Sequence, residues 1–328
     1  MYIVFIAIIS ILAGRLMFLL ATPMVKFFSH PEAVSLLLYL ETGRVVKPVM
    51  PTVPTEPVET TALEEITQPQ DQRLSFNVED AQLVQVSNFS SYPIHVTELL
   101  TQELQWDLTG SEPTVLIVHS HATESYTRTT QAYYVPSAAY RTLDTQYNIV
   151  RVGAALKKAL EAKGISVIHD TTLHDHPSYN DSYIHSRDAV QAWLEEYPEI
   201  CLVIDLHRDA ADTSSGEQLT TLATVAGEDS AQLMLVVGSN AGGRYHPNWE
   251  KNMALAAKLH AQLEKRFPGI CRPISFRTER FNQDLSAGSL LIEVGAAGDT
   301  LEEALVAVAA LAEGIADLSK GVTADSTS

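Results

Sequence analysis

Residues 115–126 read Val-Leu-Ile-Val-His-Ser-His-Ala-Thr-Glu-Ser-Tyr, an apolar run followed at once by polar side chains. Four consecutive apolar residues before a polar turn indicate a short strand that is buried on both faces. Two further segments have the same form, CLVIDLHRDA at 201–210 and SLLIEVG at 289–295. In open α/β sheets, ligands bind beyond the carboxyl ends of the strands, so these three segments decide both the fold and the place to look for chemistry.

Helical periodicity alternates with strand-like runs from about residue 112 onward. The predicted helices cover 150–162, 183–197, 248–267 and 301–318, and the other predicted strands cover 165–169, 220–225, 233–237 and 274–277. Strands that alternate with helices predict a three-layer α/β domain, with a parallel or mixed sheet flanked by helices.

The segment before this domain has a different composition. Residues 2–21 are almost wholly apolar apart from Arg15, and about 20 apolar residues are what a helix needs to cross a bilayer. This favours a retained membrane anchor, with a cleaved signal peptide as the alternative; both place the body outside the cytoplasmic membrane. The predicted organisation is an anchor or signal segment (1–22), a juxtamembrane segment and Pro-rich linker (23–72), a lead-in with a strand at 82–86 (73–111), a catalytic domain (112–320) and a disordered tail (321–328).

The formal net charge of −18 argues against nucleic-acid binding, because phosphate contacts need clustered Lys and Arg. The two cysteines, Cys201 and Cys271, lie in apolar runs and have neither a CxxC nor a zinc-finger spacing. We expect two buried thiols, and an exported protein also allows a disulfide between them.

Two histidines and a glutamate follow the first predicted strand. In a helical turn, His121 and Glu124 would share one face and could bind one metal ion. His119 lies two residues before His121. The sequence leaves open whether His119 or His121 is the ligand. The alternative is an ordinary solvated loop.

The other two strand ends carry the remaining chemistry. Asp205, His207 and Asp209 alternate onto one side of their strand, where Asp205 or Asp209 would orient the imidazole of a metal ligand. Arg208 is free to pair with a carboxylate of a peptide substrate. Glu293 stands alone in an apolar strand, where an unpaired carboxylate is rare, so we expect it to act as a general base. Ion pairs without function are the alternative.

Two imidazoles, a carboxylate ligand and a second carboxylate as base predict a zinc hydrolase, since three protein ligands leave a position open for water. The loop at 174–180, with Tyr179 and Asn180, is expected to line the substrate groove. A second metal cluster of His169, His174, Asp175, His176 and His185 is a weaker alternative. His246 and His260 are expected at the surface.

Five strings in order, VLIVHSHATESY (115–126), HDHPSYNDSYIHSRDAV (174–190), LVIDLHRDA (202–210), VVGSNAGGRYHPNW (236–249) and SLLIEVGAAGDTLEEA (289–304), resemble the stage II sporulation protein P family. The resemblance implies a fold like that of zinc-dependent N-acetylmuramoyl-L-alanine amidases. It implies cleavage of peptidoglycan between muramic acid and the stem peptide during engulfment, and also endopeptidase activity on cross-links. The implied partners are the stage II sporulation proteins D and M.

Carried over to this sequence, the resemblance implies Zn²⁺ held by His121 or His119, by Glu124 and by His207, with Glu293 as the catalytic carboxylate. The chain departs from ordinary amidases in the two-residue gap between His121 and Glu124. Two other hypotheses remain: a non-catalytic module that binds or scaffolds the cell wall, and another zinc peptidase or deacetylase acting on the same polymer.

Overall fold

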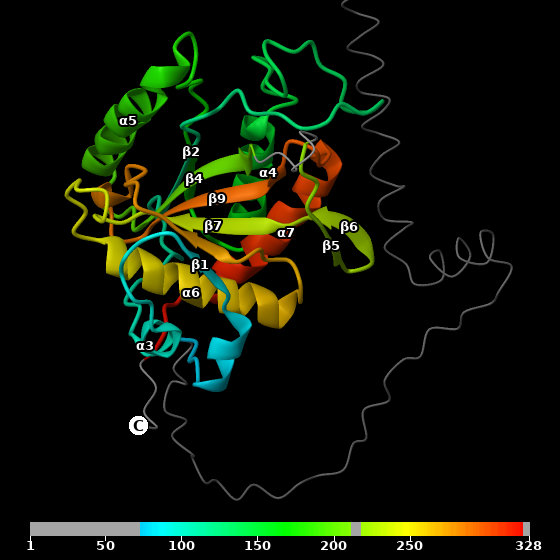
Figure 1. Ribbon diagram of the computed structural model, residues 1–328. Coiled ribbons are helices and arrows are strands. Elements are labelled where there is room, and N and C mark those ends of the chain that lie inside the picture. The colour runs from blue at the N-terminus through cyan, green and yellow to red at the C-terminus, as the bar shows by residue number, and fades with distance from the viewer. Residues whose placement is uncertain (1–72, 211–217, 324–328) are drawn as a thin grey trace, which may run out of the picture. The chain divides into compact units, whose positions relative to one another are not determined.

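A computed structural model of the protein describes residues 73–210 and 218–323 (Figure 1). These residues belong to one compact unit, Pro69–Ser328. The predicted anchor, linker and most of the predicted tail lie outside the described residues. Within the described ranges, none of the helices combines the length and apolar character that a membrane span requires.

One mixed sheet organises the unit. Its strands follow the order β1-β8-β7-β9-β4-β2-β3, and every neighbouring pair is parallel except β7 with β9. The strands are β1 (Val86–Asn88), β2 (Val115–Val118), β3 (Val167–His169), β4 (Leu202–Asp209), β7 (Leu233–Val237), β8 (Ile274–Phe276) and β9 (Ser289–Ala296). The predicted mixed sheet is confirmed.

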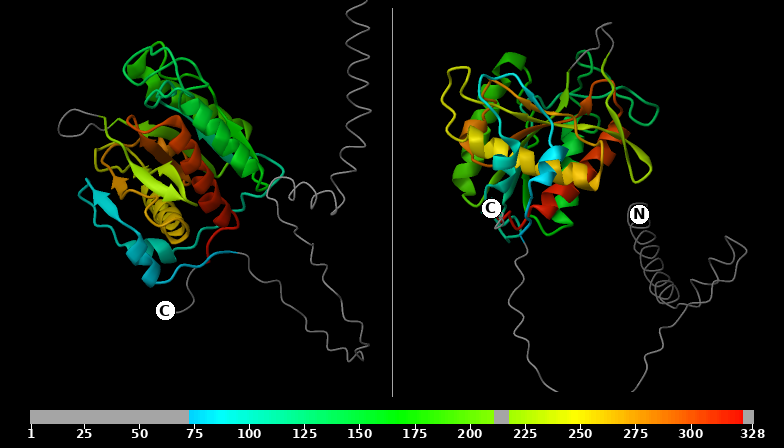
Figure 2. Two further views of the ribbon diagram at one scale, coloured as in Figure 1. Left: turned by 90° about the vertical axis from the view of Figure 1, so that its right-hand side faces the viewer. Right: turned by 60° about the horizontal axis from the view of Figure 1, so that its bottom comes forward.

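Helices cover both faces of this sheet. They are α3 (Val96–Thr101), α4 (Ile149–Glu161), α5 (Ser182–Glu196), α6 (Trp249–Arg266) and α7 (Leu301–Asp317), with the 3-10 helices η1 (Glu79–Leu83), η2 (Tyr179–Asp181) and η3 (Gln283–Leu285). Figure 2 shows α6, α7 and α4 side by side, with α7 in contact with both others. These three helices pack on one face and α5 packs on the other, which confirms the three-layer prediction.

Alternation along the buried strands sorts side chains between two cores. Val115 and Ile117 of β2 enter a large core with α4, α6 and α7. Leu116 and Val118 point the other way, into a smaller core that includes Val190 of α5. Successive side chains of a strand point to opposite faces, so residue parity tells which helices a side chain meets.

The structure corrects two predicted strands. The segment predicted at 220–225 forms β5 (Leu222–Val225), which pairs with β6 (Glu228–Ala231) in a separate hairpin beside α7. Ala226 and Gly227, both at positive φ, make the two-residue turn that such a hairpin needs. The strand predicted at 82–86 is wrong, because reciprocal bonds between Asn77 and Asp80 start the helix η1 there and the strand begins only at Val86.

Other boundaries agree closely, with one useful difference. β2 and β7 begin and end where the sequence predicts, whereas β4 continues past the strand predicted at 201–206 and ends at Asp209. This extension places His207 inside the sheet, paired with β9. Cys201 and Cys271 are free thiols, each half-buried.

We expect Lys258 to make the protein's stability depend on pH. Its side chain on α6 is buried, its Nζ donates to the carbonyl of Leu99, and burial lowers its pKa from 10.5 to about 8. Between pH 8 and 10.5 the unfolded chain keeps a proton that the folded chain releases, so stability rises with pH across that window. The rise attributable to Lys258 is about 3 kcal/mol, at about 1.4 kcal/mol per pKa unit.

Urea unfolding at pH 7 and pH 10.5 measures this rise. The Lys258→Met variant should lose it, while Lys251→Met, at an exposed position of the same helix, should keep it. Equal pH dependence in the wild type and in Lys258→Met would contradict the assignment.

Candidate active site

The predicted site residues meet on the sheet face that α5 covers. His207 of β4 pairs in register with Glu293 of β9, so the two side chains lie side by side on one face. The turn after β2 brings the His121 ring against the His207 ring, with centroids 5.4 Å apart. Glu124 reaches His207 from the same turn, with 3.3 Å between Oε2 and Nδ1. Four residues predicted from three strand ends are therefore neighbours.

His207 is held from both sides of its ring. Its Nε2 lies 2.9 Å from Asp205 Oδ1 and 2.9 Å from Ser120 Oγ, and its Nδ1 faces Glu124. Burial lowers the pKa of His207, but the two carboxylates outweigh burial and raise it well above its usual range. In this arrangement His207 is an imidazolium. Of the two carboxylates predicted as its partner, Asp205 contacts His207, whereas Asp209 pairs with Arg272.

Glu124 is buried and ionised. It accepts hydrogen bonds from the backbone N–H of Arg208 at 3.2 Å and from Arg141 Nη2 at 3.3 Å. Burial would raise the pKa of Glu124, but the hydrogen bond from His207 and its positive charge dominate and hold the pKa at about 2. A carboxylate fixed in this way presents its charge at all physiological pH values.

His121, unlike Glu124, is uncharged near pH 7. Its ring stacks on Tyr179 at 4.5 Å between centroids and meets Tyr183 edge-on at 5.5 Å. Burial, followed by the charge of His207, lowers the pKa of His121 to about 4, so the ring is neutral near pH 7. Its Nδ1 is buried and has no hydrogen-bond partner. A neutral imidazole with an unused ring nitrogen is the form that ligates a metal ion.

His119 lies on the other face of the sheet. Its Nδ1–H donates to the carbonyl of Leu206 at 2.9 Å, and its Nε2 lies 2.8 Å from Nε2 of His169. A Cβ added at Gly153 of α4 would come within 2.6 Å of both rings. The structure thus brings His121, and not His119, to His207. His119 lies on the same side as Ile117, two residues before it, whereas the turn that begins at Ser120 carries His121 to the other face.

Glu293 is the second group with an unused polar atom. Its Oε2 is buried without a hydrogen-bond partner. Burial raises the pKa of Glu293 to about 8, and the charge of Glu124 adds to the effect. Carboxylates with raised pKa values and open lone pairs are common among catalytic acids and bases.

The residue types fit a zinc ion, although their side chains do not yet converge on one point. Two imidazoles and carboxylates form a donor set that suits zinc, and the unpartnered Nδ1 of His121 and Oε2 of Glu293 are available. Within residues 73–210 and 218–323, however, no three His, Cys, Asp or Glu side chains are close enough together to hold a metal. Binding would require His207 to exchange a carboxylate partner for the ion.

The predicted substrate-binding residues differ in accessibility. Arg208 is only 3% exposed, and it donates from Nε to the carbonyl of Ser125 at 2.9 Å and from Nη2 to that of Tyr140 at 2.8 Å. It therefore fixes a loop, and a contact with substrate would require these bonds to break. Tyr179 and Asn180 are exposed on η2 beside His121 and are free to touch a ligand.

The sequence reasoning missed Arg141 and considered Asp175 only as a member of the alternative metal cluster. Arg141 pairs with Glu124 and, at 2.9 Å, with Asp175, and its guanidinium lies 4.7 Å over the Tyr179 ring. Asp175 also accepts from the hydroxyl of Thr123 at 2.5 Å. No periodicity or motif marks Arg141, which reaches both Glu124 and Asp175 only through the folding of two loops.

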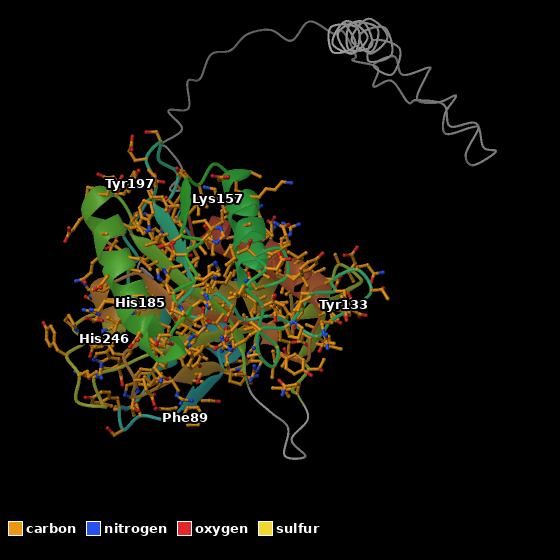
Figure 3. All side chains as sticks on the ribbon, turned by 90° about the horizontal axis from the view of Figure 1, so that it is seen from above. Phe89, Tyr133, Lys157, His185, Tyr197 and His246 are labelled. Atoms are coloured by element: carbon orange, nitrogen blue, oxygen red, sulfur yellow. The ribbon has the colours of Figure 1, made fainter. Side chains whose placement is uncertain are left out.

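The remaining histidines form no second metal centre within the described part of the chain. His169 contacts His119, His174 lies 3.4 Å from Asp170, and His185 Nδ1 donates to the carbonyl of His174. The prediction that His246 and His260 lie at the surface is wrong, because both rings are packed out of solvent. Figure 3 shows His185 and His246 far from Tyr133, which belongs to a separate loop.

Comparisons with known proteins give one family. The sequence pattern of the family described as Stage II sporulation protein P (SpoIIP) matches residues 37–316. A Bacillus subtilis (strain 168) protein named Stage II sporulation protein P is 31% identical over 206 residues, covering 60% of this chain and 48% of that protein. The chain thus matches about half the length of this relative.

Solved structures also resemble the chain. They include the N-acetylmuramoyl-L-alanine amidase AmiC2 of Nostoc punctiforme, with 15% identity, a TM-score of 0.36 and coverage of 63% of this chain and 95% of that one. Another is Ami1 from Mycobacterium smegmatis, with 13% identity, a TM-score of 0.37 and coverage of 64% and 97%. Similarity at this level assigns neither an activity nor a metal to this chain.

A methyl group at position 153 should destabilise the protein through the His119 and His169 rings. Overpacking costs about 1–3 kcal/mol, and a Cβ only 2.6 Å from both rings places this site in the upper half of that range, at about 2–3 kcal/mol. Alanine in a helix recovers about 1 kcal/mol over glycine, so we expect Gly153→Ala to lose about 1–2 kcal/mol. Thermal and urea unfolding measure the loss. Gly110→Ala is the control, since its Cβ would meet its nearest atom at 3.7 Å. Unchanged stability in Gly153→Ala would show that the two rings are not packed against α4.

Proposed function

Since the chain belongs to the stage II sporulation protein P family, we propose that it is a zinc-dependent peptidoglycan hydrolase of sporulation that cleaves the amide bond between N-acetylmuramic acid and L-alanine. The observation that carries this proposal is the gathering of His121, Glu124 and His207 beside Glu293 on one sheet face. The matched region covers only about half of the relative. The activity and substrate proposed for this chain therefore rest on the residues of its own site.

The proposed ligands are His121, Glu124 and His207. When bound, zinc supplies a Lewis acid that polarises the scissile carbonyl and lowers the pKa of a water molecule toward about 7. Asp205 holds the far nitrogen of His207 and so fixes the orientation of its ring. Arg141 holds Glu124 in place from the opposite side. His119 takes no part in this scheme, because it serves the packing of α4.

Glu293 is the proposed general base. It lies next to His207 in the sheet, so its carboxylate is near the proposed ligands. Its pKa falls from about 8 when a cation is near, because an opposite charge favours the ionised form. Glu293 would then take the proton of the attacking water and pass it to the amine that leaves.

We also propose that the chain acts on the outer side of the cytoplasmic membrane, held by residues 2–21. This rests on the apolar composition of that segment, which lies outside the described residues. The sporulation proteins D and M remain predicted partners. Endopeptidase activity on stem-peptide cross-links is a further prediction for the same site.

The first test is a digest of purified peptidoglycan by the full chain in detergent, with added zinc or with a chelator. We expect free stem peptides with zinc alone, identified by mass spectrometry. Shortened cross-links without free stems would indicate an endopeptidase, and loss of acetyl groups a deacetylase. Intact muropeptides together with co-sedimentation of the protein would indicate a non-catalytic wall-binding module.

Variants separate the metal ligands from the base. His207→Ala should lose both bound zinc, measured by metal analysis, and activity. Glu293→Gln should keep its zinc and lose kcat by about 100-fold or more, the usual contribution of a general base. His95→Ala, at an exposed position before α3, is the control and should match the wild type. Full activity in His207→Ala would refute the ligand assignment.

A further inference from the structure

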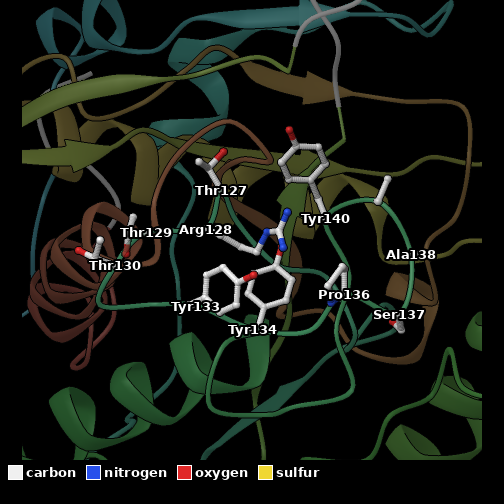
Figure 4. Close-up of a pocket in the computed structure, with 11 residues that line it drawn as sticks. Thr127, Arg128, Thr129, Thr130, Tyr133, Tyr134, Pro136, Ser137, Ala138 and Tyr140 are labelled. Carbon is white, nitrogen blue, oxygen red and sulfur yellow. The ribbon is translucent and has the colours of Figure 1, made fainter.

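A single loop lines a large, open cavity outside the four-residue site. Residues 127–140 line a hollow of about 900 Å³, whose walls include the rings of Tyr133, Tyr134 and Tyr140 and the guanidinium of Arg128 (Figure 4). Thr129 and Ser137 also line it. None of these side chains has a role in the proposed chemistry.

The loop is attached to the active site at both ends. Near its start, the Tyr134 hydroxyl donates to the carbonyl of Tyr126, and the Tyr126 hydroxyl donates to the carbonyl of Val294, the residue after Glu293. At its end, the carbonyl of Tyr140 accepts from buried Arg208 at 2.8 Å. The next residue, Arg141, pairs with Glu124. The cavity is therefore built onto the residues that flank the site.

Arg128 is the feature of this cavity that points to a ligand. Its guanidinium carbon lies 5.4 Å from the Tyr133 ring centroid and 5.9 Å from that of Tyr134. Among the described residues, no ion pair or hydrogen bond ties this guanidinium to a carboxylate, and the side chain is exposed. Arg141 and Arg208, by contrast, are bound to Glu124, Asp175 and backbone carbonyls.

Stacking on the rings orients Arg128 without using its hydrogen-bond donors. An arginine over an aromatic face keeps its N–H edge free for bidentate binding of a carboxylate. Such a charge-assisted pair is stronger than a neutral hydrogen bond, and its two parallel bonds fix the orientation of the carboxylate. The chain has a net charge of −18, so the unpaired guanidinium of Arg128 gives this cavity a local positive charge that attracts an anion.

We propose that the cavity of residues 127–140 binds an acidic peptide, the stem peptide of the substrate, and that Arg128 pairs with a free carboxylate of that peptide. The proposal rests on the proposed function for the identity of the substrate. A glycan strand lacks a free carboxylate wherever its lactyl group is bound to a stem peptide, so the guanidinium favours the peptide over the sugar. This site takes the role that the sequence suggested for Arg208, whose guanidinium is already used.

The test compares binding of two muropeptides to the full chain by calorimetry, one with free stem carboxylates and one with the same carboxylates amidated. The Glu293→Gln background prevents turnover. We expect the free acid to bind at least tenfold more tightly than the amide, and Arg128→Gln to remove this difference. Arg151→Gln, at an exposed arginine of α4 outside the cavity, should retain it. Since Arg128 is exposed, its replacement should leave unfolding by urea unchanged.

In the Glu293 wild-type enzyme, Arg128→Gln should raise KM for the free-acid muropeptide about tenfold and leave kcat unchanged. Equal binding of free acid and amide, equal loss of both on Arg128→Gln, tight binding of the peptide-free disaccharide, or no binding by the parent would each overturn the proposal. Absence of hydrolysis with the carboxylate-dependent binding intact would overturn the proposed function alone.

Discussion

A buried imidazolium between two carboxylates is the interaction on which the site depends. His207 lies within an apolar sheet, where an unpaired charge would be very costly, and Asp205 and Glu124 satisfy its two ring nitrogens. Glu124 in turn needs its own donors, which are Arg141 and the backbone of Arg208. Each buried charge thus fixes the next segment, and the loops after β2 are ordered around the end of β4.

One face of the sheet packs in the large apolar core, and the other carries the charged residues of the site. Leu202, Ile204 and Leu206 of β4 pack against the large core, while Asp205 and His207 point to the other face. The apolar contacts with α4, α6 and α7 supply the burial that offsets the cost of gathering charges opposite them. His119 shows the same division. It lies on the face covered by α4, α6 and α7, where its ring packs against Gly153 of α4.

The sequence predicts the parts of the site that depend on strand position. His121, Glu124, His207 and Glu293 were expected together because parallel strands present their carboxyl ends at one edge. The choice between His119 and His121 depended on which way the turn leaves the sheet, which spacing does not reveal. Arg141, Asp175 and the 127–140 cavity depend on contacts between aperiodic loops. The burial of His246 and His260 likewise follows from tertiary packing, which polar neighbours in the sequence do not indicate.

The charge balance of the site bears on the proposed zinc. His207 carries its proton in the space where the carboxylates of Asp205 and Glu124 concentrate negative charge, so the proton and a metal ion compete for the same neighbourhood. His121 is already neutral and has a free nitrogen, but His207 must lose a proton before it can ligate. Zinc binding by this set would therefore release a proton, and its affinity would rise with pH until His207 no longer holds one in the zinc-free protein.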